Sequence, residues 1–397
     1  MKRMTMLGCL VAALALSGCS TVGGHAAAGA GASRPHRRTT PSASAPPTAR
    51  LRGSTHRHPA GRPLVFTAAH GTISSLTVRG GGHTVPVESS QQGRRWRSTG
   101  QLIPGTRYRA RLDLVGADGR HRTRTLSVRT RKAARTLTMT ATPGPGWTDG
   151  VGEPVVVHFS SPVSDEAAVE RHLSISTSHG PVRGSWHWFS PTVVHYRPRH
   201  FWPADTTVHV HVDLRGVRAG HGLWGDRDHD WSWRVGNRHV TRVNARRHTF
   251  TVTDNGKTVH RWPTGMGMPG FATRDGIYAV IDKEHTVQMT SCSVGLSCNR
   301  NSANYYNLKV YWATRLTDTG TFVHAAPWDS QLGRANTSHG CIHLSTADAQ
   351  SFYQFSSPGD VVVVRGTGRA PDLPSDPGMM DWNMSWSQWK AGSALHH

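Results

Sequence analysis

Residues 320–328 read GTFVHAAPW, residues 336–355 read NTSHGCIHLSTADAQSFYQF, and a valine run at 361–364 closes the segment. The FVH triplet is typical of a strand, which puts His324 on a different strand from Cys341. A thiol is nucleophilic only when a nearby base or cation favours its thiolate, since a free cysteine has a pKa of about 8.5. His324 and His339 are the candidate bases. Because Gly340 suggests that main-chain amides approach a ligand, His339 is expected to act through its backbone, and His324 is the better base.

Two other interpretations of Cys341 remain open on the residues alone. His339, Cys341 and His343 alternate along the chain and can face one way, so that His324 would complete a set of four zinc ligands. Several ligands on one short strand crowd a tetrahedral site, which counts against zinc, and no metal or other cofactor is expected. Cys341 can also be a small buried apolar residue.

The five cysteines point to an odd thiol. Cys9 and Cys19 lie in the N-terminal leader, which leaves Cys292, Cys298 and Cys341 in the rest of the chain. Cys292 and Cys298 share a loop rich in Gly, Ser and Asn and can close a small disulfide, leaving Cys341 free.

The N-terminus has the features of an export signal. Lys2 and Arg3 precede an apolar run at 7–16, and Leu-Ser-Gly-Cys follows at 16–19. This arrangement resembles a bacterial lipoprotein signal, in which Cys19 is lipidated and becomes the first mature residue; an ordinary secretory signal is the alternative. We therefore expect residues 1–19 to be removed and the protein to be anchored on the outer face of the membrane, reaching into the cell wall. Residues 20–63 lack large apolar side chains and are expected to form a disordered basic tether.

Two β-rich modules are expected at 64–132 and 136–237. Apolar residues alternate in short runs separated by Gly, Pro and Asp-Gly turns, and Pro104-Gly105-Thr106 before one run has a counterpart in Pro203-Ala204-Asp205 about 100 residues later. Two immunoglobulin-like sandwiches are the natural interpretation. The catalytic residues fall in a third β-rich domain, 238–366, which opens with a hairpin around Asn255-Gly256, and a Trp-rich tail at 367–397 is expected to pack on the second module. The fold class is thus mainly β.

The charge is strongly basic and uneven. Lys and Arg number 46 against 24 Asp and Glu, a net charge of +22, and most of the excess lies before residue 238. Such a field attracts polyanions, but no nucleic-acid-reading motif is present, so we expect anionic cell-wall polymers as possible partners and no nucleic acid.

The segment that contains the thiol resembles the catalytic signature of the YkuD-type L,D-transpeptidases. The resemblance rests on Ser338-His339-Gly340-Cys341, on His324 seventeen residues before the cysteine, and on the DAQSFY that follows. The two immunoglobulin-like modules and the tail DWNMSWSQWKAG at 381–392 are similar to the layout of the actinobacterial members.

The resemblance implies peptidoglycan cross-linking. Such enzymes attack the carbonyl of the third residue of a stem tetrapeptide, expel D-Ala, and transfer the acyl group to the side-chain amine of another stem, which makes a 3→3 link. Cys341 would be the nucleophile and His324 its base, oriented by the Ala325 carbonyl. The amides of residues 339–341 would form the oxyanion hole. The residues expected to bind substrate are Tyr306, Met289, Trp328, Ser338 and His343.

Three points stay open. His343 stands where the family commonly has Arg or Asn, so its role is in doubt. Hydrolysis, as in an L,D-carboxypeptidase that trims tetrapeptides, is an alternative, because the motif does not specify the acceptor. A non-catalytic wall-binding lipoprotein is the other alternative, motivated by the basic, aromatic-rich modules.

Overall fold

The structure is a computed structural model that describes residues 45–371 and 380–395. Within these residues it contains 28 strands, three short α-helices and one 3-10 helix, which confirms the mainly β fold class. No helix in this described part is long and apolar enough to cross a membrane. The expected signal, Cys19 and residues 20–44 of the expected tether lie outside the described residues.

The first module is a two-sheet sandwich around its own apolar core. One sheet has the order β1-β2-β6-β5, with bounds Thr48–Leu51, Val65–Ala69, Arg95–Ser98 and Val87–Ser90. The other has the order β4-β3-β7-β8, with bounds His83–Val85, Gly71–Gly80, Arg107–Gly116 and His121–Arg129.

The C-terminal part of the expected tether belongs to this module, so the boundary at residue 63 is wrong. Strand β1 pairs antiparallel with β2, Ala49 is fully buried, and the buried His58 forms a bridge with Thr130. Composition missed the strand because main-chain hydrogen bonds hold it in the sheet, and these depend little on large apolar side chains.

The second module repeats the sandwich. One sheet joins β10 (Met139–Thr142), β12 (Val155–Phe159), β15 (Val193–Pro198) and β14 (Gly184–Ser190). The other joins β11 (Thr148–Asp149), β19 (Asp228–Val235), β16 (Thr207–Asp213) and β13 (Leu173–Thr177). A small sheet of β17 (Arg218–Gly220), β18 (Leu223–Gly225) and β9 (Arg135–Leu137) and the short helix α1 (Glu166–Glu170) complete it.

The repeated sequence element forms the same corner in both modules. Gly105 and Asp205 both have positive φ, +69° and +56°. The Gly105 amide donates to the Arg131 carbonyl at 2.9 Å, and the Asp205 amide donates to the Gly236 carbonyl at 3.2 Å. In each module the corner therefore ties the start of a long central strand to the strand that ends the module, which supports the predicted repeat.

The third domain combines two sheets and one helix. The five-stranded sheet runs β22-β21-β20-β28-β23, with bounds Lys257–Pro263, Thr249–Asp254, His239–Asn244, Val361–Arg365 and Gly276–Ala279. The four-stranded sheet runs β24-β25-β26-β27, with bounds Asp282–Thr290, Asn307–Arg315, Phe322–Ala325 and Ile342–Leu344. Helix α2 (Thr346–Phe355) packs on β25, β26 and β27, and its Phe352 ring meets Phe250 of the other sheet at 4.9 Å. Asn255 and Gly256 form the predicted hairpin turn, both with positive φ.

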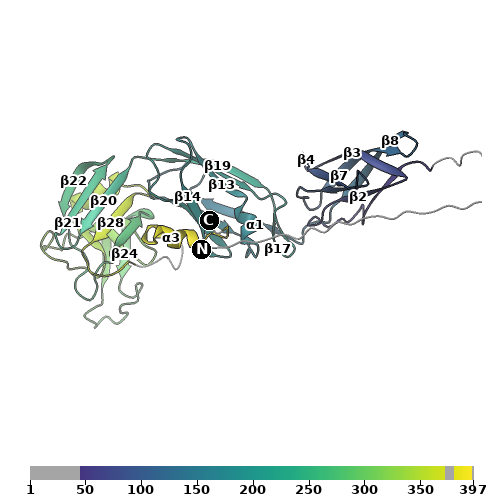
Figure 1. Ribbon diagram of the computed structural model, residues 1–397. Helices are drawn as coiled ribbons and strands as arrows, with labels where there is room; N and C mark the ends of the chain where they lie inside the picture. Colours follow the sequence, from purple (N-terminus) through teal and green to yellow (C-terminus); the bar gives the residue numbers. More distant parts are fainter. Residues whose placement is uncertain (1–44, 372–379, 396–397) are drawn as a thin grey trace, which may run out of the picture. The chain divides into compact units, whose positions relative to one another are not determined.

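The described part of the tail packs on the second module, as predicted. The 3-10 helix η1 (Asp381–Asn383) is followed by α3 (Trp386–Ala391), which lies beside β14 (Figure 1). The Trp389 indole N–H donates to the Ser185 carbonyl at 2.9 Å. Arg197 lies over three tail rings, with its guanidinium carbon 4.6 to 5.5 Å from the centroids of Trp382, Trp386 and Trp389.

Candidate active site

A cavity of about 620 Å³ opens beside the four-stranded sheet of the third domain. All nine catalytic and substrate-binding residues predicted from the sequence line it: Met289, Tyr306, His324, Trp328, Ser338, His339, Gly340, Cys341 and His343. The fold brings them together because β26 and β27 are adjacent parallel strands, with Val323 opposite Ile342 and His324 opposite His343. Cys341 immediately precedes β27.

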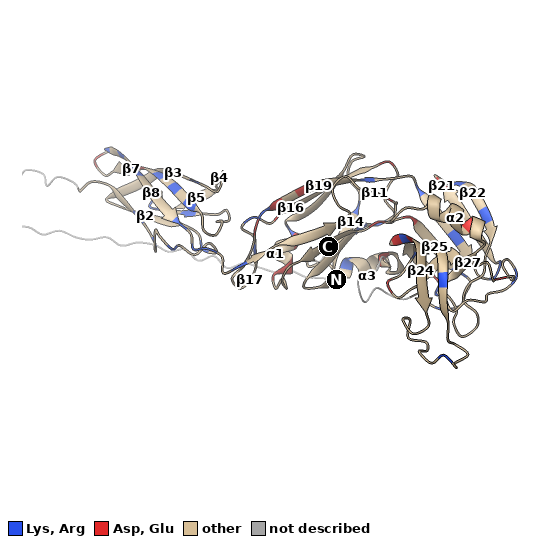
Figure 2. Ribbon diagram, turned by 180° about the vertical axis from the view of Figure 1, so that it is seen from behind, with Lys and Arg blue, Asp and Glu red and all other residues tan. Residues whose placement is uncertain are grey.

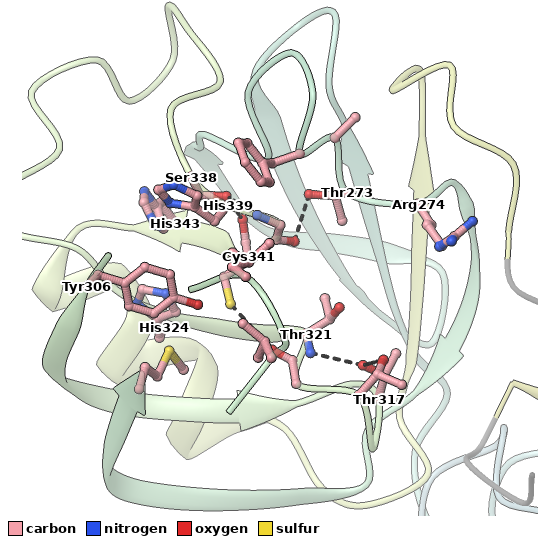
Figure 3. Close-up of a pocket in the computed structure, with 18 of the residues that line it drawn as sticks. Thr273, Arg274, Tyr306, Thr317, Thr321, His324, Ser338, His339, Cys341 and His343 are labelled. Atoms are coloured by element: carbon pink, nitrogen blue, oxygen red, sulfur yellow. Dashed lines mark hydrogen bonds between the residues drawn. The ribbon is translucent and has the colours of Figure 1, made fainter. Parts of the chain in front are cut away.

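Cys341 and His324 line the same cavity, and each makes its hydrogen bond to a main-chain carbonyl. Among the described residues Cys341 is the free cysteine, and its Sγ lies 3.7 Å from the Gly320 carbonyl oxygen. Figure 3 shows the sulfur directed toward the loop that carries Thr317 and Thr321. His324 is 3% exposed, and its Nδ1 donates to the Ala325 carbonyl at 2.9 Å, as expected. This bond fixes the tautomer and leaves Nε2 as the proton acceptor.

Burial keeps both groups neutral. It raises the pKa of the Cys341 thiol to about 11, although a backbone hydrogen bond from Phe322 acts in the opposite direction. Burial, together with a smaller effect of the nearby His343, lowers the pKa of His324 to about 3. The resting pair is therefore a thiol and a neutral imidazole, so nucleophilic attack by this sulfur would require transfer of the thiol proton.

Ser338 organises the turn that carries Cys341. Its hydroxyl donates to the Cys341 carbonyl at 2.6 Å and accepts from the Gly340 amide at 3.0 Å, and the residue is 4% exposed. Thr273 holds the other side, with its hydroxyl 2.8 Å from the Gly340 carbonyl. Of the three amides predicted to form the oxyanion hole, that of Gly340 is already bonded in this structure. The amides of His339 and Cys341 remain the candidates.

The ring of His339 belongs to the cavity wall. It packs between Phe271 and Tyr306, with ring centroids 4.7 and 5.3 Å away, and its Nε2 is buried without a hydrogen-bond partner. Burial lowers the pKa of His339, so its imidazole is neutral. Burial and the neighbouring Cys341 raise the pKa of Tyr306, which keeps its hydroxyl protonated.

Met289 and Trp328 line different parts of the cavity. Met289 packs with the small apolar cluster around Val310 and Phe322 that also receives Cys341. Trp328 is 50% exposed, and its ring centroid lies 6.2 Å from that of His324. Trp328 therefore offers an apolar face to a ligand at the mouth of the cavity.

His343 is a buried histidine with a carboxylate partner. Its Nδ1 lies 2.7 Å from Asp329 Oδ2, and the two side chains are 8% and 3% exposed. Asp329 also accepts from the Thr337 hydroxyl at 2.6 Å and from the Gln331 amide at 3.0 Å. Across residues 45–371 and 380–395 no three His, Cys, Asp or Glu side chains are grouped so as to hold a metal ion.

The comparisons with known proteins agree with this site. Residues 238–364 match the L,D-transpeptidase catalytic domain model, and residues 56–218 match a bacterial Ig domain model. L,D-transpeptidase 2 of Mycobacterium tuberculosis (strain CDC 1551 / Oshkosh) is 36% identical over 334 residues, which are 84% of this chain and 81% of that protein. The chain belongs to the L,D-transpeptidase family.

Two further similarities support the family membership. L,D-transpeptidase 1 of Mycobacterium tuberculosis (strain ATCC 25618 / H37Rv) is 37% identical over 227 residues, covering 56% of this chain and 83% of that protein. A solved L,D-transpeptidase in complex with imipenem aligns with a TM-score of 0.51 and 34% identity, over 58% of this chain and 99% of that one.

Two polar residues of this L,D-transpeptidase site were missed from the sequence. Asp329 is the single carboxylate between His324 and Cys341, and that position was a usable signal. Thr273 comes from a loop before β23, and nothing local marks it as a partner of Gly340. Only the fold brings it to the turn.

The loop between β24 and β25 forms another wall of the L,D-transpeptidase cavity. Cys292 and Cys298 form a disulfide within it, the pairing that the cysteine count had left open. Val294 and Leu296, between the two cysteines, line the cavity. The disulfide therefore restrains the segment of this loop that lines the same cavity as the thiol.

Proposed function

We propose that this L,D-transpeptidase cross-links peptidoglycan through a thioester on Cys341. The observation that carries the proposal is the free thiol of Cys341 in the same cavity as His324. His324 lies on β26, is buried and neutral, and has its tautomer fixed by the Ala325 carbonyl. The donor would be a stem tetrapeptide. Its acyl group would pass to the side-chain amine of a second stem and make a 3→3 link.

The acylation step uses groups that the site provides. His324 Nε2 takes the thiol proton while the sulfur attacks the carbonyl of the third stem residue, and the amides of His339 and Cys341 stabilise the oxyanion. The C–N bond then breaks, and D-Ala leaves as the amine after receiving that proton. A rotation of the Cys341 side chain away from the Gly320 carbonyl is required first, because the sulfur has no hydrogen bond to His324 in the described structure.

The test is to incubate the protein with a purified stem tetrapeptide whose side-chain amine is free and to look for products by mass spectrometry. Release of D-Ala together with a cross-linked dimer supports the transpeptidase. Release of D-Ala without dimer would replace it by the hydrolase, in which water is the acceptor. A Cys341→Ala protein that keeps every activity would point to a non-catalytic wall-binding role.

We further propose that the protein is a lipoprotein on the outer face of the membrane, held through Cys19. The support is the sequence of residues 1–19, with its charged start, apolar run and Leu-Ser-Gly-Cys ending. Two or three acyl chains on one residue give stable anchoring. Mass spectrometry should find the acyl chains on Cys19 of the unchanged protein and none on a Cys19→Ser variant, whereas an unmodified Cys19 in the membrane-bound protein would contradict the anchor.

An anionic wall polymer is a further proposed partner of the first module. Five exposed arginines share one face of its β4-β3-β7-β8 sheet, where Arg79 stands opposite Arg109 and Arg107 stands opposite Arg129. Figure 2 shows Lys and Arg positions in blue along the strands of this module. Like charges directly opposite each other destabilise a sheet, so a bound polyanion would relieve a real cost. Arg111 completes the set.

The polymer proposal is tested with a soluble poly(glycerol phosphate). Binding should weaken steeply with salt, and changing Arg107 and Arg109 to Gln should reduce both the affinity and the salt dependence. Equal binding by the variant would contradict the assignment of this face.

A further inference from the structure

The two histidines beside the thiol have different partners. His324 and His343 face each other across β26 and β27, with ring centroids 5.0 Å apart. The Nδ1 of His324 donates to a carbonyl oxygen, which carries no net charge, whereas the Nδ1 of His343 donates to the ionised Asp329. A carboxylate stabilises an imidazolium much more than a carbonyl does. Of the two histidines, His343 is therefore better suited to accept a proton and carry it transiently.

The second nitrogen of His343 is available to a ligand. His343 lines the cavity with Cys341, and its Nε2 has no hydrogen-bond partner among the described residues. Burial lowers the pKa of His343, while the hydrogen bond to Asp329 and the charge of that carboxylate act in the opposite direction. At neutral pH the ring is therefore an unprotonated base. The titratable groups that surround it are Asp329, His324, His339, Cys341 and Tyr306.

The second half of a transpeptidation needs such a base. An alkyl amine acceptor arrives as an ammonium ion, since its pKa is about 10.4, and the ion has no lone pair with which to attack. His324 is poorly suited to remove this proton, because no carboxylate lies against its imidazolium.

We propose that His343, oriented by Asp329, is the base that removes a proton from the acceptor's ammonium group in the second half-reaction. The assignment rests on the transpeptidase function proposed above and leaves the thiol proton to His324. His343 thereby becomes a catalytic residue of acceptor activation, instead of the substrate-binding residue predicted from its position in the motif.

The step balances with no other reactant. The acceptor's ammonium gives one proton to Nε2 of His343, which releases it to solvent. The neutral amine attacks the thioester carbonyl, the C–S bond breaks, and a second proton passes from the nitrogen through His324 to the Cys341 sulfur. The products are an amide, a neutral thiol and one proton.

The experiment separates the two half-reactions in the full chain. A donor tetrapeptide with an acetylated side-chain amine forms the acyl-enzyme, which mass spectrometry follows on Cys341. Two acceptors are then compared at neutral pH: a stem peptide with a free side-chain amine, which is an ammonium, and hydroxylamine, which is already neutral. The variants are His343→Gln and Asp329→Asn.

We expect both variants to acylate within about threefold of the unchanged protein, while His343→Gln slows transfer to the ammonium acceptor by about 10² to 10⁴. Transfer to hydroxylamine should stay near its original rate. Raising the pH should restore the variant, because the acceptor then loses its proton unaided. His239→Gln is the matched control, since it removes another His–carboxylate bond, 2.9 Å to Asp360, away from the cavity.

Three results would overturn the proposal: acylation that falls as much as transfer, hydroxylamine transfer that falls as much as ammonium transfer, or unchanged transfer in both variants. The first two would indicate a structural or thiol-directed role. If the unchanged protein forms no acyl-enzyme at Cys341, the proposed function fails instead, so the two failures are distinguishable.

Discussion

Asp381 of the tail lies 3.0 Å from His195 of the second module, Oδ2 to Nδ1, and both side chains are completely buried. Within residues 45–371 and 380–395, Asp381 Oδ1 and His195 Nε2 are buried without hydrogen-bond partners. Arg197, 2% exposed, adds a guanidinium near the same carboxylate. Burial lowers the pKa of Arg197 to about 10, while the charge of Asp381 acts in the opposite direction. The tail is thus held by a buried cluster of charges as well as by its tryptophans.

Asp381→Asn should destabilise the second module and loosen the tail. Removing one partner of a buried charge cluster typically costs about 3 to 5 kcal/mol, because the other charge is left without compensation. We expect a melting temperature lower by roughly 10 °C and faster proteolysis within residues 380–395. Differential scanning calorimetry and limited proteolysis measure the two effects.

Ser387→Ala is the control for that experiment, since Ser387 is exposed on the same helix, α3. It should change the melting temperature by no more than a degree or two. If Asp381→Asn has the same melting temperature as Ser387→Ala, the buried cluster contributes no net stability.

The tail illustrates what the sequence could predict of the fold. Tryptophans clustered after a domain end must be buried against something, so their packing on the second module was predictable. The partners His195 and Arg197 were not, because they lie almost 190 residues upstream and no local pattern links them to Asp381. Strand β1 was not predicted for a related reason, since its pairing depends on backbone groups that all sequences share.

The residues of the candidate site also fall into those that the sequence could predict and those that it could not. The FVH triplet predicted that His324 lies on a different strand from the segment of Cys341, and the structure places that strand beside the one that follows Cys341. The hydrogen bonds of Ser338 and Thr273 depend on how the turn closes and on a distant loop, and the sequence gives no access to either. His343 was predicted to lie in the cavity, but its partner Asp329 was not, because the loop after β26 brings that carboxylate to the ring.

Ser338→Ala should lower kcat and leave KM for the donor nearly unchanged. The hydroxyl is buried and bonded within the turn, so its loss shifts the Cys341 backbone and does not remove a substrate contact. Misplacing a reactive group by about 1 Å can cost about 10²-fold in rate, and we expect a loss of about tenfold to a hundredfold. Steady-state release of D-Ala measures it.

Thr273→Ser and Thr273→Val provide the matched pair for this prediction. Serine keeps the hydroxyl that bonds the Gly340 carbonyl and should retain activity, whereas valine should resemble Ser338→Ala. A raised KM with normal kcat in Ser338→Ala would instead restore the substrate contact predicted from the motif.

Removing the Cys292–Cys298 disulfide should affect KM for the donor and kcat differently. Replacing Cys292 and Cys298 by serine removes a restraint that is worth about 2 kcal/mol in the chain-entropy account, and it frees the segment that carries Val294 and Leu296. We expect KM for the donor to rise several-fold while kcat is kept. Peptide mapping under non-reducing conditions is the companion measurement, in which Cys341 should carry an alkyl label and Cys292 and Cys298 should remain linked.

The pH dependence of acylation tests the neutral pair at the centre of the site. A carbapenem should add once, at Cys341, and the rate should be nearly flat from about pH 5 to about pH 9, because a pKa of about 3 for His324 and of about 11 for Cys341 both lie outside that range. His324→Ala should slow the addition by roughly 10² to 10⁴ at neutral pH. Its rate should then climb about tenfold per pH unit, since only the thiolate reacts without a base and its population grows toward the raised pKa of the thiol.

Labelling at Cys292 or Cys298, or a flat profile at the original rate in His324→Ala, would move the nucleophile or the base to another residue. A rate that falls between pH 9 and pH 5 in the unchanged protein would contradict pKa values of His324 and Cys341 that both lie outside that range.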